Sequence, residues 1–175
     1  FILLFISAHA ALKGRDGRKA ALSFVAALLA ATEILDYAVL HLPDGPARFM
    51  RAATFAESLM PAAFALFSLG YARQGSIRSL PLHWRAFLLS TAVFPICVIF
   101  LPAHAFFFSP DLLTERVLFL GNAGYWFYIG MLLYLTVSLL NLEMTFSAAG
   151  AADRERMKLE FIGMSAILAV LVFYY

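Results

Sequence analysis

Long apolar segments alternate with short polar segments along this chain. Most of the apolar segments hold about 20 residues, enough for an α-helix to cross the roughly 30 Å of hydrocarbon in a bilayer. The pattern therefore predicts an all-α fold, a polytopic bundle of transmembrane helices that forms a single membrane domain over residues 1–175. The expected helices cover 1–12, 20–42, 52–72, 86–107, 117–142 and 159–175.

The first and last apolar segments are too short for a membrane crossing. Each holds about a dozen residues, fewer than the roughly 20 that a spanning helix needs. The chain also begins with Phe1 rather than with a methionine. We therefore expect six helices in a fragment of a longer protein, with the first and last helices truncated.

Prolines interrupt two of the expected helices. Pro61 falls within 52–72, and Pro95 and Pro102 fall within 86–107. Each proline removes a backbone donor and can kink a membrane helix while neighbouring groups satisfy the freed carbonyl. We expect the helix at 86–107 to be the least regular.

Composition supports a fold in lipid. Hydrophobic residues make up 63% of the chain and charged residues only 14%, too few charges for a domain whose surface meets water. The net charge of +2 is small and does not indicate nucleic-acid binding. A lone cysteine, Cys97, excludes an internal disulfide.

The basic residues are unevenly distributed. Ten of the thirteen lysines and arginines fall in three stretches, 13–19, 73–85 and 147–158, and the two intervening polar loops hold the other three. Cytoplasmic loops of membrane proteins carry an excess of Lys and Arg. The distribution therefore predicts a multi-pass membrane protein with these three loops in the cytoplasm.

Acidic residues inside the apolar segments are the candidates for function. An intramembrane carboxylate is costly, so it usually faces the bundle interior and marks a functional site. Helix geometry places two acids on one face of 20–42 and a third at a similar depth on 52–72. We expect a sensory polar pocket open to the exterior. Its predicted residues are Glu33, Asp36, Glu57, His41, His104 and Asn122.

A structural role is the alternative for the same residues. Glu33 would then be a protonated, hydrogen-bonded link between helices, and the other acids would reach the headgroup region. The histidines would be interfacial. Glu33, Asp36, Glu57 and His104 have the chemistry of metal ligands but no diagnostic spacing, so no metal site is predicted.

Catalytic motifs are absent from the sequence. It contains no HExxH, GxSxG or glycine-rich phosphate loop. No catalytic residue and no cofactor are therefore predicted within this chain.

Residues 139–164 read LLNLEMTFSAAGAADRERMKLEFIGM. This stretch resembles the pattern NLE.T.R.....R...K....G in the amino-terminal multispanning region of bacterial sensor histidine kinases, especially the PrsK-like kinases of the PEP-CTERM and exosortase system. The matching residues are Asn141, Leu142, Glu143, Thr145, Arg154 or Arg156, Lys158 and Gly163.

The charges of this motif suggest a contact across one short cytoplasmic loop. Glu143 would end one helix, and Arg154, Arg156 and Lys158 would precede the next, so opposite charges could pair there. The alternative is that the cations only hold the loop inside the cell.

The resemblance implies that roughly eight helices precede a cytoplasmic GAF-like region, a dimerisation helix with the phosphorylated histidine, and an ATP-binding domain. ATP and Mg²⁺ would bind only in that missing part, which would act on a response regulator. The protein would be a homodimer in the lipid bilayer of the bacterial cytoplasmic (inner) membrane. Two alternatives stay open: a membrane sensor module of another output enzyme such as a diguanylate cyclase, and a small transporter or integral-membrane enzyme.

Overall fold

The computed structural model describes residues 17–41, 46–72, 80–108 and 119–174. Helices dominate this part, and two two-residue strands pair antiparallel, Phe107 opposite Leu120. The expected helix at 1–12 lies outside the described residues. The elements are α2 (Gly17–His41), α3 (Pro46–Ser58), α4 (Met60–Ala72), α5 (Leu82–Ser90), α6 (Val93–Phe100), α7 (Ala103–Phe106), β1 (Phe107–Phe108), β2 (Phe119–Leu120), α8 (Asn122–Ala148) and α9 (Ala151–Tyr174).

Four apolar stretches of the structure are long enough to cross a membrane. They are Ala21–Val39, Phe49–Gly70, Leu82–Phe100 and Asn122–Ala148. The apolar part of α9, Phe161–Phe173, is shorter. The expected all-α bundle of membrane-spanning length is confirmed.

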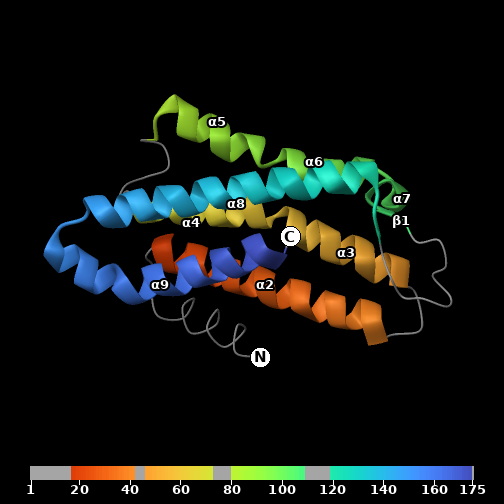
Figure 1. Cartoon of the computed structure of the whole chain (residues 1–175), viewed down its shortest axis with the longest axis horizontal. Coiled ribbons are helices and arrows are strands. Elements are labelled where there is room, and N and C mark those ends of the chain that lie inside the picture. Colours follow the sequence, from red (N-terminus) through yellow and green to blue (C-terminus); the bar gives the residue numbers. More distant parts are fainter. Residues whose placement is uncertain (1–16, 42–45, 73–79, 109–118, 175) are drawn as a thin grey trace.

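The helices run up and down, so their ends gather at two ends of the bundle (Figure 1). One end holds the start of α2, the end of α4, the start of α5 and the turn between α8 and α9. These helix ends adjoin the three basic stretches of the sequence, and we call this the basic end. The end of α2, the start of α3, α7 and the start of α8 lie at the opposite end.

The α3–α4 segment is the most buried part of the bundle. Within Phe49–Gly70, 72% of the apolar window is buried, because this segment packs against α2 and α4 also packs against α8. Small residues such as Ala53, Ala56 and Ala63 let the neighbouring backbones approach closely. Larger core side chains, including Met60 and Phe64, fill the space between the helices.

A break at Leu59 divides α3 from α4. Pro61 has no N–H, so it cannot donate to the carbonyl of Glu57 four residues earlier. The chain turns more tightly here, with the Leu59 N–H donating to the Ala56 carbonyl at 3.2 Å. One predicted helix, 52–72, is therefore two helices that together begin at Pro46.

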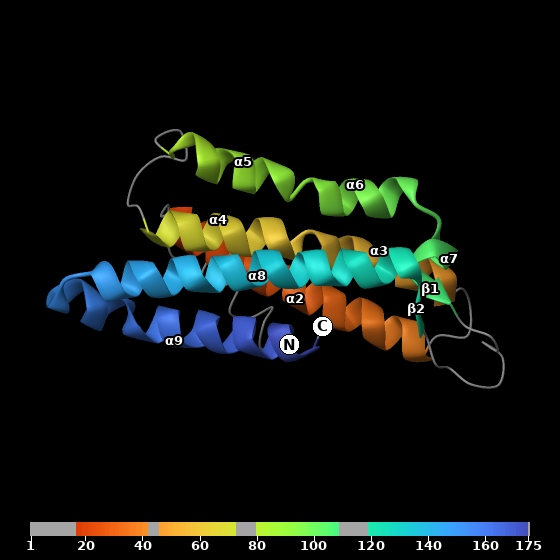
Figure 2. The same cartoon turned by 45° about the horizontal axis from the view of Figure 1, so that its top comes forward.

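The α5–α6 segment is broken in the same way. Pro95 leaves the Thr91 carbonyl without its usual donor, and the Phe94 N–H bonds that carbonyl instead at 3.2 Å. Pro102 then follows the end of α6 and precedes the short α7. The expectation that 86–107 is the least regular helix is confirmed. The segment forms the outermost layer on one side of the bundle (Figure 2).

The last two helices differ from their predicted bounds. Helix α8 begins at Asn122 rather than at 117, because 119–120 pairs as a strand, and it continues to Ala148 rather than ending at 142. Helix α9 begins at Ala151 rather than at 159. The basic stretch 147–158 is thus mostly helical, since it is rich in Ala, Glu, Arg and Lys, which favour helices, and only Ala149 and Gly150 interrupt it.

Candidate functional site

A hydrogen bond between two helices lies inside the bundle. The Tyr128 hydroxyl of α8 donates to Glu57 Oε2 of α3 at 2.7 Å. Glu57 is only 6% exposed and Tyr128 9%. A polar group buried in apolar surroundings is costly unless it is hydrogen-bonded, so this bond ties α3 to α8.

A stripe of polar residues along α3 positions Glu57. Thr54 lies three residues after Arg51, and Glu57 and Ser58 lie three and four residues after Thr54, so the four gather on one side of the helix. The hydroxyls bond to carbonyls of their own helix, Thr54 to Met50 at 2.9 Å and Ser58 to Phe55 at 2.6 Å. Arg51 and Glu57 instead reach other helices.

Two glycines position Tyr128 by allowing α8 to approach α7 closely. A Cβ atom on Gly124 would lie 2.2 Å from the Phe106 carbonyl oxygen, and one on Gly121 would lie 2.5 Å from that of Ala105. The Gly121 N–H donates to the Phe106 carbonyl at 2.7 Å. The backbone of α7 therefore rests directly on α8, one turn before Tyr128.

Aromatic rings complete this contact. Phe106 and Phe127 meet edge to face with ring centroids 5.2 Å apart, and Phe127 meets Phe94 of α6 in the same way at 5.6 Å. Such arrangements place the positive ring edge against the negative face. They fix the first turns of α8 against α6 and α7.

Arg51 links α3 to the end of α6. Its Nη2 donates to the Ile99 carbonyl at 2.9 Å and lies 3.5 Å from that of Val98. Both carbonyls belong to the last turn of α6, where Pro102 cannot donate to Val98. A cation at a helix C-terminus also interacts favourably with the helix dipole, so Arg51 caps α6.

A small hollow adjoins this cap, and we call it the α3–α6 hollow. It contains none of the six residues predicted to form a pocket. Its lining residues are Met50, Arg51, Thr54, Val98, Leu101, Ala103, Phe106 and Phe107.

The other two acids of the predicted pocket lie on α2. Glu33 is exposed and Asp36 is half-buried. His41, at the end of the same helix, is exposed, stacks on Tyr37 with ring centroids 4.0 Å apart and lies 3.0 Å from its carbonyl. The structure thus places Glu57 against α8 and leaves Glu33 on the surface of α2.

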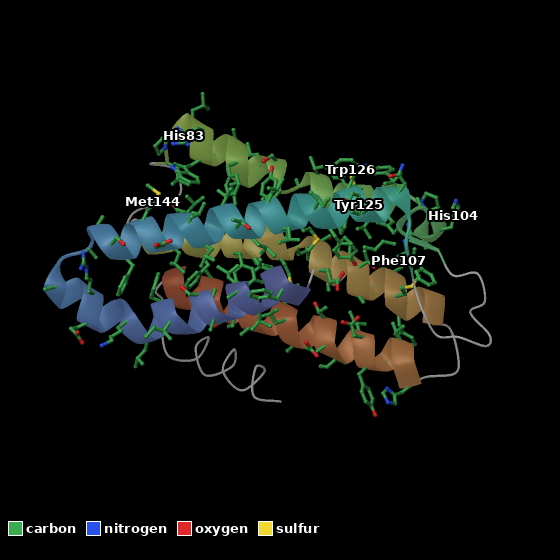
Figure 3. The ribbon with its side chains drawn as sticks, viewed as in Figure 1. His83, His104, Phe107, Tyr125, Trp126 and Met144 are labelled. Carbon is green, nitrogen blue, oxygen red and sulfur yellow. The ribbon has the colours of Figure 1, made fainter. Side chains whose placement is uncertain are left out.

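The remaining residues of the predicted pocket lie on the surface of the opposite end. His104 of α7 and Asn122, the first residue of α8, are both exposed. Figure 3 shows His104 at this end and His83 at the basic end. Among the described residues, no three His, Cys, Asp or Glu side chains are grouped to hold a metal ion, so the four possible ligands named from the sequence do not form one cluster.

The motif at 139–164 lies on two helices. Asn141, Glu143 and Thr145 belong to α8 rather than to a loop, and the Thr145 hydroxyl donates to the Asn141 carbonyl at 2.7 Å. The Asn141 Nδ2 atom is buried, and no hydrogen-bond partner for it lies in the described part of the chain.

The cations of the motif belong to α9, and Lys158 is exposed. The Arg154 guanidinium donates to the Ser147 carbonyl at the end of α8, and Glu143 is exposed. Arg154 therefore caps α8, which differs from the pairing with Glu143 that the sequence left open as one of two possibilities. The side chain of Arg156 lies outside the described part.

Sequence reasoning did not identify Tyr128 or Arg51 as functional candidates. Tyr128 falls in the first third of an apolar segment, where a hydroxyl needs a partner, and it was indistinguishable from the aromatic residues that mark the interface. Tyr125 and Trp126 of the same helix are such interfacial residues, and both are exposed (Figure 3).

Comparisons with protein-family models, with curated proteins and with solved structures found no match to the chain.

Proposed function

We propose that the chain is the sensory and anchoring membrane module of a two-component sensor histidine kinase similar to the PrsK-like kinases. The observation that carries the proposal is the buried hydrogen bond between Glu57 and Tyr128. Ionisable residues inside membrane-spanning segments are expensive and for that reason are usually functional. The resemblance of residues 139–164 to the kinase family supports the choice of output.

The input acts at the Glu57–Tyr128 bond. This bond joins α8 to the central α3–α4 segment near its proline break. A stimulus that breaks or rearranges the bond changes the packing of α8 against that segment. Two packed arrangements that differ in free energy are sufficient for a switch, since a ligand or a bilayer change then shifts their populations.

The change reaches the basic end through α8. This helix extends 27 residues, about 40 Å at 1.5 Å per residue. Near its end, Phe146 stacks on Phe161 of α9 with ring centroids 4.2 Å apart, which couples the two helices. In this proposal the basic end lies in the cytoplasm of a bacterium. The protein is a homodimer in the inner membrane, and a kinase core with ATP, Mg²⁺ and a response regulator receives the signal.

Substitutions in the full-length parent protein test the sensory role. Glu57→Gln and Tyr128→Phe keep the side-chain shape but alter the bond, so autophosphorylation in proteoliposomes is expected to change. Glu33→Gln is a matched control, because it removes an acid that is exposed on α2. Unaltered kinase activity in both test variants, under every stimulus to which the parent responds, would rule out the sensory role.

The output is tested separately by sequencing the parent gene beyond residue 175. A histidine-containing dimerisation helix followed by an ATP-binding domain supports the kinase. A diguanylate cyclase domain in its place would be compatible with the sensory role, but it would replace the kinase as the output enzyme. Substrate flux through the membrane part alone, abolished by Glu57→Gln, would instead identify a transporter.

A further inference from the structure

The α3–α6 hollow combines one cation with apolar walls. Arg51 and seven other residues line it. Six of these side chains are apolar, and the hydroxyl of the seventh, Thr54, is bonded to its own helix. A ligand for such a site needs an anionic group joined to an apolar part.

Arg51 has N–H donors that the cap on α6 does not use and that such a ligand could bind. A guanidinium carries five N–H donors, and the cap on α6 uses only Nη2. In the described part of the chain, the other nitrogens of Arg51 make no hydrogen bond, and the residue is exposed. An anion can therefore bind Arg51 without breaking the cap.

The surface beside Arg51 suits an acyl chain. Ile96, Ile99 and Phe100 of α6 are 50%, 52% and 79% exposed. Ile99 and Phe100 lie three and four residues after Ile96, so the three share one face that ends beside the cap. The face belongs to a stretch long enough to cross a membrane, where lipid chains run parallel to it.

We propose that the α3–α6 hollow binds an anionic phospholipid of the surrounding bilayer. The phosphate accepts hydrogen bonds from the free donors of Arg51, and one acyl chain lies along the exposed face of α6. Arg51 suits this role because its planar fork can bind phosphate oxygens in pairs. The site requires only that the bundle lies in a bilayer, so it does not depend on the proposed kinase output.

The test measures lipid selectivity. The purified chain is reconstituted in phosphatidylcholine vesicles with a trace of spin-labelled phosphatidylglycerol or spin-labelled phosphatidylcholine, and the motionally restricted fraction of each label is compared. We expect about a two- to fivefold preference for phosphatidylglycerol, the range for an exposed ion pair. Equal association of the two lipids would overturn the proposal.

Variants locate the preference on the molecule. Arg51→Gln is expected to lower it about twofold or more, and Arg85→Gln to lower it less, because Arg85 also bonds a backbone carbonyl, that of Leu80 at 2.8 Å, but is one of many cations near the basic end. A preference that Arg51→Gln lowers no more than Arg85→Gln does would contradict the site. Ala103→Leu fills the hollow without altering Arg51, and it should lower the preference as Arg51→Gln does, which keeps the test decisive if Arg51→Gln does not fold.

Inorganic phosphate distinguishes the lipid from a soluble anion. Inorganic phosphate has no acyl chain, so contact with the face of α6 does not contribute to its binding. At the same ionic strength as a chloride control, phosphate should therefore not displace the labelled phosphatidylglycerol. Displacement by phosphate but not by chloride would show that the hollow takes a free anion, and it would overturn the lipid assignment.

Discussion

The α3–α4 and α5–α6 segments share an apolar character and an internal proline, but they differ in how deeply the fold buries them. Each is long enough to cross a membrane, and each is broken close to a proline. Yet 72% of the apolar window is buried in the first segment and only 17% in the second. Helix α5 has no buried residue at all.

Side-chain size explains the difference. The α3–α4 segment carries many alanines, with two serines and one threonine, and these small side chains let α2 and α8 approach its backbone. The α5–α6 segment carries large side chains such as Leu89, Ile96 and Phe100, which extend outward. A proline in an apolar segment therefore predicts a break, whereas the residues around the proline decide whether that break lies inside the bundle or at its surface.

The largest expected effect comes from forcing α7, which follows the α5–α6 segment, away from α8, which packs against the α3–α4 segment. Gly124→Ala places a Cβ 2.2 Å from the Phe106 carbonyl oxygen, so α7 must move away from α8. We expect a loss of about 1 to 3 kcal/mol in the free energy of unfolding, as for other overpacked sites. Equilibrium unfolding in mixed micelles measures it. Gly150→Ala is the control, because nothing lies within 4 Å of its Cβ position; equal losses would contradict this account.

Removing the central hydrogen bond is expected to have the next largest effect. Tyr128→Phe takes away the hydroxyl that donates to Glu57, and bonds between membrane helices contribute about 0.6 to 1.7 kcal/mol. Tyr125→Phe, on the exposed side of the same helix, should leave unfolding unchanged. If the two variants unfold alike, the bond does not stabilise the α3–α4 segment.

Loosening the peripheral segment should have a local effect. Arg51→Gln weakens the cap on α6, which carries Cys97, the only cysteine of the chain. We expect maleimide to label Cys97 about two- to fivefold faster, equivalent to losing about 0.5 to 1 kcal/mol of local stability. The control is Arg85→Gln at the basic end, which should leave the labelling rate unchanged. An unchanged rate in Arg51→Gln would show that the cap does not hold α6.

The smallest effect is expected at a buried polar atom that has no partner in the part of the chain that the structure describes. Asn141→Leu removes the unbonded Nδ2 of α8, so it should leave the free energy of unfolding unchanged or raise it slightly. The same mixed-micelle titration measures this change. Ser138→Ala is the comparison, since the Ser138 hydroxyl is bonded to the Tyr134 carbonyl at 2.9 Å. A marked loss in Asn141→Leu would mean that this amide has a partner in the membrane.

The sequence predicts more of the fold than of the candidate site. Spans and proline breaks follow from local rules of hydropathy and backbone donors, and Pro61 and Pro95 act as expected. The partner of Glu57 does not follow from such rules. Depth along the membrane placed it level with the acids of α2, but helix rotation and packing turn it toward Tyr128 of α8. Depth along the membrane shows which residues lie at the same level, but it does not show which of them face one another.

The helix α8 has a mechanical consequence. It contains no proline along its 27 residues, so it bends far less readily than the broken segments beside it. Phe146 lies about 27 Å along the helix from Tyr128, so a tilt of about 5° at Tyr128 moves Phe146 by about 2 to 3 Å. Loss of one contact at Tyr128 can thus become a displacement of Phe146 large enough to separate stacked rings. A broken helix tilted in the same way would bend at its break, and its far end would move less.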